Sequence, residues 1–275
     1  GSALRMSRVA AGSEGPICIL GMPRSGTTWV GKIFDSHPDT LYRHEPDSGG
    51  ALDHVAIHAG PEHDGPNARS MRAFMDELPR WRTPKVCGKQ PVFPKAWLPG
   101  WRGGLREASI QFSRLASVLM RVPVLEPVHP RATPPRPVWK SIESTGRAGL
   151  IANTHPGVRV ILVVRHPCGQ IDSTLRGESG RRFTDAGAAA DDWGIFEYLL
   201  ETEQARRRGL TMDSFRDISA EERLAWRWLL FNEKAMEELQ GRANARVLRY
   251  EDLCASPLTT ARSLLDFAGL RWEEA

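Results

Sequence analysis

Short apolar runs of β-forming residues recur along the chain and alternate with segments of helical pattern. The runs are almost continuously apolar, which indicates strands that are buried on both faces. Strands of this kind joined through helices form a parallel sheet with helices on either side. We expect five such strands, at residues 16–21, 40–43, 137–140, 158–164 and 245–250. The sequence therefore predicts a three-layer α/β fold, with a central parallel β-sheet flanked by helices.

Capping and composition predict where helices and loops lie between these strands. A Ser/Glu capping box begins a long helix at residues 219–240, and a Ser-Pro cap begins another at 257–269. A third amphipathic helix is expected at 105–120. Five prolines exclude regular structure from residues 126–137, and the small, charged segment 178–190 has the composition of a mobile loop.

Composition and charge limit the class of protein. The 275 residues are 41% hydrophobic and 25% charged, as in ordinary globular proteins, so we expect one domain at residues 16–275 after a flexible N-terminus at 1–15 that begins with a tag remnant. A formal charge of +4 without a basic run argues against nucleic-acid binding. No apolar run approaches the roughly 18 residues that span a bilayer, so no stable membrane insertion is expected.

The cysteines and histidines show no metal-binding pattern. Cys18, Cys87, Cys168 and Cys254 are far apart and include no CxxC pair, and the histidines lack ligand spacing. Four cysteines are too few for a disulfide-stabilised secreted fold. We therefore expect reduced, mostly buried thiols, a cytoplasmic location and no metal.

The segment from Gly21 to Trp29, G-M-P-R-S-G-T-T-W, lies between the first expected strand and a helix. Backbone N–H groups of such a loop and of the helix N-terminus converge on an anion. Gly21 and Gly26 let the backbone turn tightly and approach a ligand closely. Because their spacing matches the phosphate-binding P-loop, the sequence predicts an anion site in a P-loop-type fold.

Two departures from the nucleotide-kinase pattern indicate the chemistry at this loop. Thr27 occupies the position of the lysine that contacts the β- and γ-phosphates, Thr28 occupies the Ser/Thr position, and the cation Arg24 lies inside the loop instead. The strongest strand, 158–164, is followed by Arg165 rather than by an aspartate that could hold Mg²⁺. We therefore expect the loop to bind its anion without a metal.

Three segments resemble motifs of the sulfotransferases that use 3′-phosphoadenylyl sulfate (PAPS). Residues 23–29 resemble the loop that binds the 5′-phosphosulfate in that family. Arg165 at a strand end, with Ser173 eight residues later, resembles its 3′-phosphate motif, and residues 249–253, R-Y-E-D-L, resemble its Y-E-D-L segment. The three segments occur in the family's order, and together they extend over most of the chain.

The resemblance implies PAPS as co-substrate and PAP (3′-phosphoadenosine 5′-phosphate) as product, with no metal. It also implies that Trp29 stacks on the adenine. Tyr250 either lines the adenine pocket or is a core tyrosine. A guanidinium suits a phosphate because it makes charge-assisted, bidentate hydrogen bonds. The residues expected to bind PAPS are Arg24, Ser25, Gly26, Thr27, Thr28, Trp29, Arg165, Ser173 and Tyr250.

The resemblance offers two patterns for the general base that takes the acceptor proton. Cytosolic small-molecule sulfotransferases use a histidine on a K-T-H strand, which this sequence lacks. Golgi carbohydrate and protein-tyrosine sulfotransferases use a glutamate, and Glu45, 21 residues after Arg24, matches that layout. Glu45 is therefore the expected base, and His44 and Glu143 are the alternatives. If the strand continues, His44 should point to the face opposite Glu45.

Cations are expected to stabilise the charge that develops on the leaving phosphate oxygen. Lys140, 25 residues before Arg165, resembles the strand-end lysine of the family. We expect Lys140 and Arg24 to share this role, and Lys89 is an alternative with weaker placement.

The resulting hypothesis is a PAPS-dependent sulfotransferase that moves a sulfuryl group, by in-line displacement, onto a hydroxyl or amine of a small-molecule or glycan acceptor such as a carbohydrate, phenol or lipid. A P-loop small-molecule kinase would need ATP and Mg²⁺, and the missing lysine argues against it. A non-catalytic module that binds PAP or another nucleotide is the other alternative. The sequence does not indicate an oligomeric state.

The acceptor pocket is expected within three irregular segments, at residues 46–101, 121–137 and 178–195. Four tryptophans of these segments and of the third strand form either an aromatic platform for the acceptor or part of the core. They are Trp81, Trp97, Trp101 and Trp139.

Overall fold

A sheet of five parallel strands, in the order β2-β3-β1-β4-β5, lies at the centre of the computed structural model of the chain. The described residues are 14–98, 100–116, 122–126, 134–179 and 189–272. The strands are β1 Ile17–Leu20, β2 Thr40–His44, β3 Arg136–Ser141, β4 Arg159–Val164 and β5 Ala245–Arg249. All five expected strands are therefore confirmed.

Helices connect the strands and cover the sheet. The first half of the chain has α1 Thr27–Ser36, α2 Pro66–Glu77, α3 Pro84–Cys87 and α4 Trp101–Ala116, followed after β3 by α5 Ala148–Thr154. The second half has α6 Pro167–Ser179, α7 Trp193–Leu200, α8 Glu203–Arg206, α9 Asp213–Arg216, α10 Ala220–Leu239, α11 Tyr250–Ala255 and α12 Pro257–Phe267. Short 3₁₀ helices are Leu78–Arg80, Thr145–Arg147 and Ala189–Asp191. Within the described residues, no helix has the length and apolarity needed to cross a bilayer.

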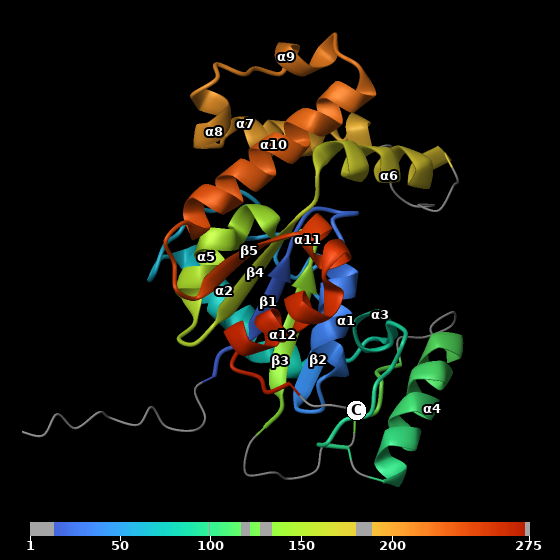
Figure 1. The fold of residues 1–275 in the computed structure, drawn as a ribbon. Helices are drawn as coiled ribbons and strands as arrows, with labels where there is room; N and C mark the ends of the chain where they lie inside the picture. The colour runs from blue at the N-terminus through green and yellow to red at the C-terminus, as the bar shows by residue number, and fades with distance from the viewer. Residues whose placement is uncertain (1–13, 99, 117–121, 127–133, 180–188, 273–275) are drawn as a thin grey trace, which may run out of the picture.

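Two hydrophobic cores lie on opposite faces of the sheet. Alternate β1 side chains enter each core, with Cys18 and Leu20 on one face and Ile17 and Ile19 on the other. The first core packs against α2, α5 and α10, and the second against α1, α11 and α12. Figure 1 shows these helices around the sheet. The predicted three-layer α/β architecture is confirmed.

A third cluster of buried apolar residues lies beyond the carboxyl ends of the strands. It joins α7, α9 and α10 to Met22 in the loop after β1. Figure 1 shows α6 to α9 beyond the arrowheads of the strands. In parallel sheets, ligands bind at this edge, at the point where the order in which strands are added to the sheet reverses. Here that point is β1, between β3 and β4.

Some sequence expectations need correction. The helix expected at 105–120 begins earlier, at Trp101, and is described to Ala116, while residues 117–121 lie outside the described part of the chain. The Pro-rich segment becomes regular at its end, because β3 already includes Arg136 and Pro137. The greater parts of the expected irregular segment 126–137 and of the loop 178–190 lie outside the described residues.

Candidate active site

The Gly-rich loop (residues 21–29) connects β1 to α1 and passes twice through left-handed backbone conformations. Arg24 has a φ of 68° and Gly26 a φ of 93°. Gly26 precedes α1, and no side chain caps the first turn of that helix. The first N–H groups of a helix have no intrahelical partner and carry the positive end of its dipole. The loop therefore presents an uncapped helix N-terminus, which favours an anion.

Neighbouring atoms leave no room for a side chain at either glycine of the loop. A Cβ on Gly21 would lie 2.5 Å from the carbonyl oxygen of Val163, and a Cβ on Gly26 would lie 2.3 Å from Cδ2 of Tyr250. Ser25 is buried, and its hydroxyl donates to the carbonyl oxygen of Met22 at 2.7 Å. The Ser25 side chain therefore stabilises the loop from within.

The residues expected at the two ends of the nucleotide lie together. Arg24 Nε donates to Ser173 Oγ at 2.9 Å, and Arg165 Nη1 donates to the carbonyl oxygen of Arg24 at 3.0 Å. The guanidinium of Arg165 lies 4.9 Å from the centroid of the Tyr250 ring. That ring meets Trp29 edge-on at 6.1 Å, and Trp29 is 40% exposed. Segments from three parts of the chain thus form one cationic, aromatic surface beside the loop.

Three further side chains, which the sequence interpretation missed, hold this surface in place. Gln170 Nε2 donates to the carbonyl oxygen of Pro23 at 2.8 Å, and Trp228 Nε1 donates to that of Arg165 at 2.9 Å. The Glu251 carboxylate accepts from the backbone N–H of the residue after Arg165, at 2.9 Å. Glu251 belongs to the Y-E-D-L segment and could have been found there, but Gln170 and Trp228 have no local signal.

Glu45 follows β2 in a left-handed conformation, with a φ of 48°. Its N–H donates to the carbonyl oxygen of Lys140 at 2.8 Å, and the Lys140 ammonium forms an ion pair with its carboxylate. Because the left-handed residue breaks the alternation of the strand, His44 Nε2 lies 3.8 Å from Glu45 Oε1. His44 was expected on the opposite face only if the strand continued, and β2 ends at His44.

Burial and the ion pair act in opposite directions on Glu45. Burial alone would raise the pKa of the carboxyl, but the charge and hydrogen bond of Lys140 outweigh it and hold the pKa of Glu45 below its usual value of 4.5. Burial, with the nearby charge of Lys140, lowers the pKa of His44 to about 4. At neutral pH the site thus contains an ionised Glu45 beside a neutral imidazole.

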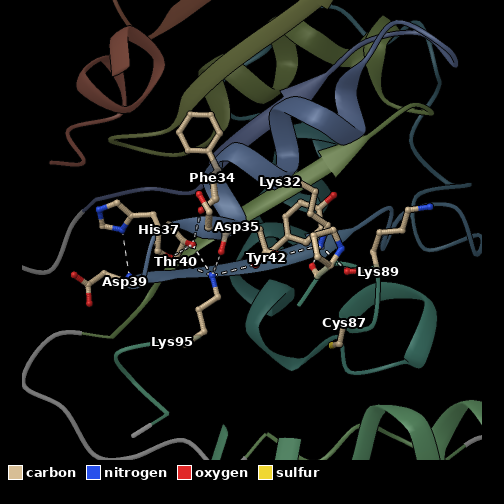
Figure 2. Close-up of polar contacts among 12 residues, drawn as sticks. Lys32, Phe34, Asp35, His37, Asp39, Thr40, Tyr42, Cys87, Lys89 and Lys95 are labelled. Carbon is tan, nitrogen blue, oxygen red and sulfur yellow. Dashed lines mark hydrogen bonds and ion pairs between the residues drawn. The ribbon is translucent and has the colours of Figure 1, made fainter. Parts of the chain in front are cut away.

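A polar network behind β2 fixes these side chains. The Tyr42 hydroxyl lies 2.9 Å from His44 Nδ1, and the Lys32 ammonium lies 4.6 Å from the centroid of the Tyr42 ring. Lys32 and the buried Lys95 both form ion pairs with Asp35, near the end of α1. Figure 2 shows this group between α1 and β2. Buried polar groups with satisfied partners rigidify their surroundings, so this network restrains Tyr42 and its partner His44, the residue before Glu45.

The alternative residues lie in different surroundings. Lys89 is exposed, and it is its carbonyl oxygen that accepts from Lys32, at 2.6 Å (Figure 2). Glu143 follows β3, and partial burial together with the carboxylates of Asp47 and Glu45 raises its pKa above 4.5.

Two cavities adjoin the site. The larger, of about 1080 Å³, is bordered by Glu45, Glu77 and residues 80–86, and the smaller, of about 290 Å³, is bordered by Pro23 and Glu143. Ser48 borders both. Since the volume of the larger cavity suits a small organic molecule, Glu45 lies where it can reach a bound hydroxyl.

The four tryptophans do not share one surface. Trp97 and Trp139 are completely buried in different cores, and Trp101 is 72% exposed on α4. Trp81 borders the larger cavity and packs against Phe74. Of the two interpretations, the core therefore accounts for Trp97 and Trp139, and only Trp81 lies at a cavity.

The cysteines and the acidic groups carry no metal pattern in the described part of the chain. All four cysteines are free, but only Cys18 and Cys87 are buried, whereas Cys168 and Cys254 are exposed. The expectation of mostly buried thiols is therefore half wrong. Among the described residues, no three His, Cys, Asp or Glu side chains are grouped to hold a metal ion.

The sequence matches the model of a family described as the sulfotransferase family over residues 16–274, which is nearly its whole length. This chain belongs to the sulfotransferase family. The predicted resemblance is thereby confirmed at the level of the family. None of the curated protein sequences compared with this sulfotransferase matches it.

Solved sulfotransferase structures resemble the chain distantly. The sulfotransferase domain from the curacin biosynthetic pathway has 16% identity and a TM-score of 0.47, with 95% of this chain and 76% of that chain covered. A sulfotransferase from Alicyclobacillus acidocaldarius has 14% identity and a TM-score of 0.42, with 94% and 82% covered. One from Mycobacterium tuberculosis has 14% identity and a TM-score of 0.43, with 96% and 70% covered. Family membership rests on the match of the family model.

Proposed function

We propose that this sulfotransferase moves a sulfuryl group from PAPS onto the hydroxyl or amine of an acceptor by in-line displacement. The observation that carries the proposal is the convergence of Arg24, Arg165 and Ser173 beside an uncapped helix N-terminus, with the ionised Glu45 at the same edge of the sheet, after β2. Guanidinium groups and helix N-termini both favour phosphate.

The side chains beside the loop, guanidinium groups and aromatic rings, suit the phosphates and the adenine of an adenosine nucleotide. A Cβ at Gly26 would meet the Tyr250 ring, so glycine lets the loop and Tyr250 pack closely beside the proposed adenine site. In the proposal Arg24 and residues 25–28 hold the 5′ end, Arg165 and Ser173 hold the 3′-phosphate, and Trp29 and Tyr250 flank the adenine. PAPS supplies, when bound, an activated sulfuryl group with a phosphate as its leaving group.

Glu45 takes the acceptor proton in this proposal. Its carboxylate is the basic form at neutral pH, because Lys140 keeps its pKa low. The positive charges of Lys140 and Arg24 stabilise the negative charge that develops opposite the acceptor. The absence of a metal from the reaction, a cytoplasmic location and the single domain at 16–275 stay predictions that accompany this function.

Thermal unfolding with nucleotides tests the donor site. PAP should raise the melting temperature more than ADP does, because only PAP carries the 3′-phosphate expected at Arg165 and Ser173. The variant Arg165→Ala should lose about 1.5–3 kcal/mol of PAP binding free energy, the scale of a charged hydrogen bond. Arg176→Ala is the matched control, since Arg176 is exposed and already paired with Asp172. Equal shifts of the melting temperature with PAP and ADP would contradict PAPS as the sulfuryl donor.

Transfer of labelled sulfate tests the reaction itself. Wild-type protein should move label from PAPS to an alcohol, and Glu45→Gln should lower kcat by roughly 10²–10⁴ while PAP still binds. Glu143→Gln is the comparison that separates the two candidate bases. Retained turnover in Glu45→Gln, with a loss in Glu143→Gln, would identify Glu143, which borders the smaller cavity, as the base.

A further inference from the structure

Glu126 is a buried carboxylate that lies within 4 Å of three guanidinium groups. Arg43 contacts it with both Nη atoms, at 2.6 and 3.3 Å, and Arg106 Nε lies 2.9 Å away. Arg82 Nε lies farther off, at 3.9 Å. Both Arg43 and Arg106 have backbone carbonyls as their other partners, and burial raises the pKa of the neighbouring thiol Cys87 to about 12, so it is uncharged. The group therefore holds two positive charges more than its carboxylate neutralises.

Arg82 is the member of this group that reaches a ligand site. Its side chain is 38% exposed and borders the larger cavity, the one that Glu45 also borders. Its buried Nε atom has no hydrogen-bond partner among the described residues. That nitrogen is enclosed by protein and faces Glu126, so an anion in the cavity would contact the exposed remainder of the Arg82 side chain.

A second cation borders the same cavity. Lys85 is exposed, and its ammonium donates to Ser48 Oγ at 2.7 Å, with no carboxylate within 4 Å in the described part of the chain. Ser48 in turn donates to the carbonyl oxygen of Glu45 at 2.9 Å, so Lys85 lies along the same wall as Glu45. Arg80 also borders the cavity, but Glu77 neutralises it.

Much of the remaining wall is apolar. Trp81, Val86, Val122 and Pro123 contribute to it, and more of the lining belongs to apolar than to polar atoms. The cavity thus combines apolar surface, the Glu45 carboxylate, the paired Glu77 and Arg80, and two further cations, of which Arg82 only shares the Glu126 carboxylate with two other arginines. A bulky neutral sugar would leave both the apolar wall and the cations without complementary groups.

We infer that the acceptor of this sulfotransferase is an alcohol with an apolar body and an anionic group, carboxylate or phosphate, which Arg82 and Lys85 bind while the hydroxyl faces Glu45. The inference rests on the proposed function, because it takes the cavity beside Glu45 as the acceptor site. It deepens that function by assigning a charge and a polarity to the acceptor.

Calorimetry on the PAP-bound protein tests the inference with four probes of equal chain length. These are ω-hydroxydecanoate, ω-hydroxydecyl phosphate, decanediol and aminodecanol, which differ only in the group at one end. The carboxylate or the phosphate should bind at least about tenfold more tightly than decanediol, since a charged hydrogen bond has that scale, and aminodecanol should bind most weakly. Whichever anion binds more tightly identifies the anionic group.

Substitutions then connect the preference to the two cations. Arg82→Gln and Lys85→Gln should each reduce the advantage of the anionic probe by about tenfold, whereas the paired Arg80→Gln should change it by less than about threefold. PAP affinity, measured in the same samples, should stay at the wild-type value. Loss of PAP binding in the wild type would contradict the proposed function instead.

Three results would overturn the inference while PAP still binds. They are equal affinity for decanediol and the anionic probes, no measurable binding of either anion, and an anion preference that survives in the double variant Arg82→Gln with Lys85→Gln.

Discussion

Arg24 Nε donates a hydrogen bond of 2.9 Å to Ser173 Oγ, and this bond joins the Gly-rich loop to α6 across 149 residues of sequence. Arg165 completes the connection, because its guanidinium donates to the carbonyl oxygen of Arg24. The two arginines and the serine are therefore held relative to one another by the protein itself. Such preorganisation lowers the entropy that a ligand must lose when it binds.

Replacing Ser173 tests this arrangement. In Ser173→Ala the guanidinium of Arg24 loses one partner and the proposed 3′-phosphate site loses one donor. PAP should bind more weakly by about 1 kcal/mol, roughly fivefold, and calorimetry measures the change. Ser173→Thr keeps a hydroxyl and should bind PAP nearly as the wild type does. An unchanged Kd in Ser173→Ala would exclude the hydroxyl from the donor site.

With Glu45 as the proposed base, we expect Lys140 to set the acid limit of activity. In the wild type the pKa of Glu45 is below 4.5, so the base is ionised throughout the neutral range and kcat should be flat there. Lys140→Met removes the lowering charge and leaves burial, which raises the pKa of a carboxyl. The acid limb of the kcat profile should therefore move to higher pH by roughly one unit or more, with a lower plateau. Lys89→Met should leave the limb where it is, and an unmoved limb in Lys140→Met would separate Lys140 from the base.

His44 links stability to pH. Its pKa is about 4 in the folded protein against 6.5 ordinarily, because burial and Lys140 disfavour the charged ring. The unfolded chain therefore binds the proton first as the pH falls. Stability should be complete above pH 6.5 and decline from there to pH 4, by an amount on the order of 3 kcal/mol.

Urea unfolding at several pH values measures this slope. His44→Gln should be less stable than the wild type at neutral pH, since the contact with Tyr42 changes, but its stability should fall less between pH 6.5 and 4. His63→Gln, at an exposed position, should keep the wild-type slope. Identical slopes in all three proteins would show that His44 is not the titrating group.

Local patterns predicted the strands and the loop, because the information lies in neighbouring residues. The apolar runs indicated β1 and β4, and the spacing of Gly21 and Gly26 indicated the turn between β1 and the helix. The carboxyl ends of parallel strands meet at one edge, so Glu45 and Arg165 could be placed at that edge without a structure. Their hydrogen-bond partners could not be placed in the same way.

Contacts between distant segments were missed for a physical reason. Arg43 and Glu126 are 83 residues apart, and Glu126 lies in a Pro-rich segment with no periodicity, so no local pattern pairs them. Alternation would place His44 on the face opposite Glu45 only along extended backbone, and the left-handed Glu45 ends the strand. A non-glycine residue with positive φ has no reliable sequence signal.

Gly26 lies where the chain tolerates no side chain, and this gives a strict test of the loop. Its φ is 93°, and a Cβ would meet the Tyr250 ring at 2.3 Å. Gly26→Ala must therefore combine backbone strain with displacement of Tyr250. We expect a loss of stability of more than about 1–2 kcal/mol, the cost of left-handed backbone alone, and at least roughly tenfold weaker PAP binding.

Gly209→Ala separates the two effects. Gly209 also has positive φ, 62°, but a Cβ at this position would have no atom within 4 Å among the described residues, so only the backbone strain remains. This variant should lose about 1–2 kcal/mol of stability and bind PAP as the wild type does. If both variants lose the same stability and both keep wild-type PAP affinity, two conclusions follow. The Tyr250 ring can move away from residue 26 without a cost in stability, and the contact between the loop and Tyr250 plays no part in PAP binding. If only Gly26→Ala loses PAP affinity, the contact between the loop and Tyr250 is part of the donor site.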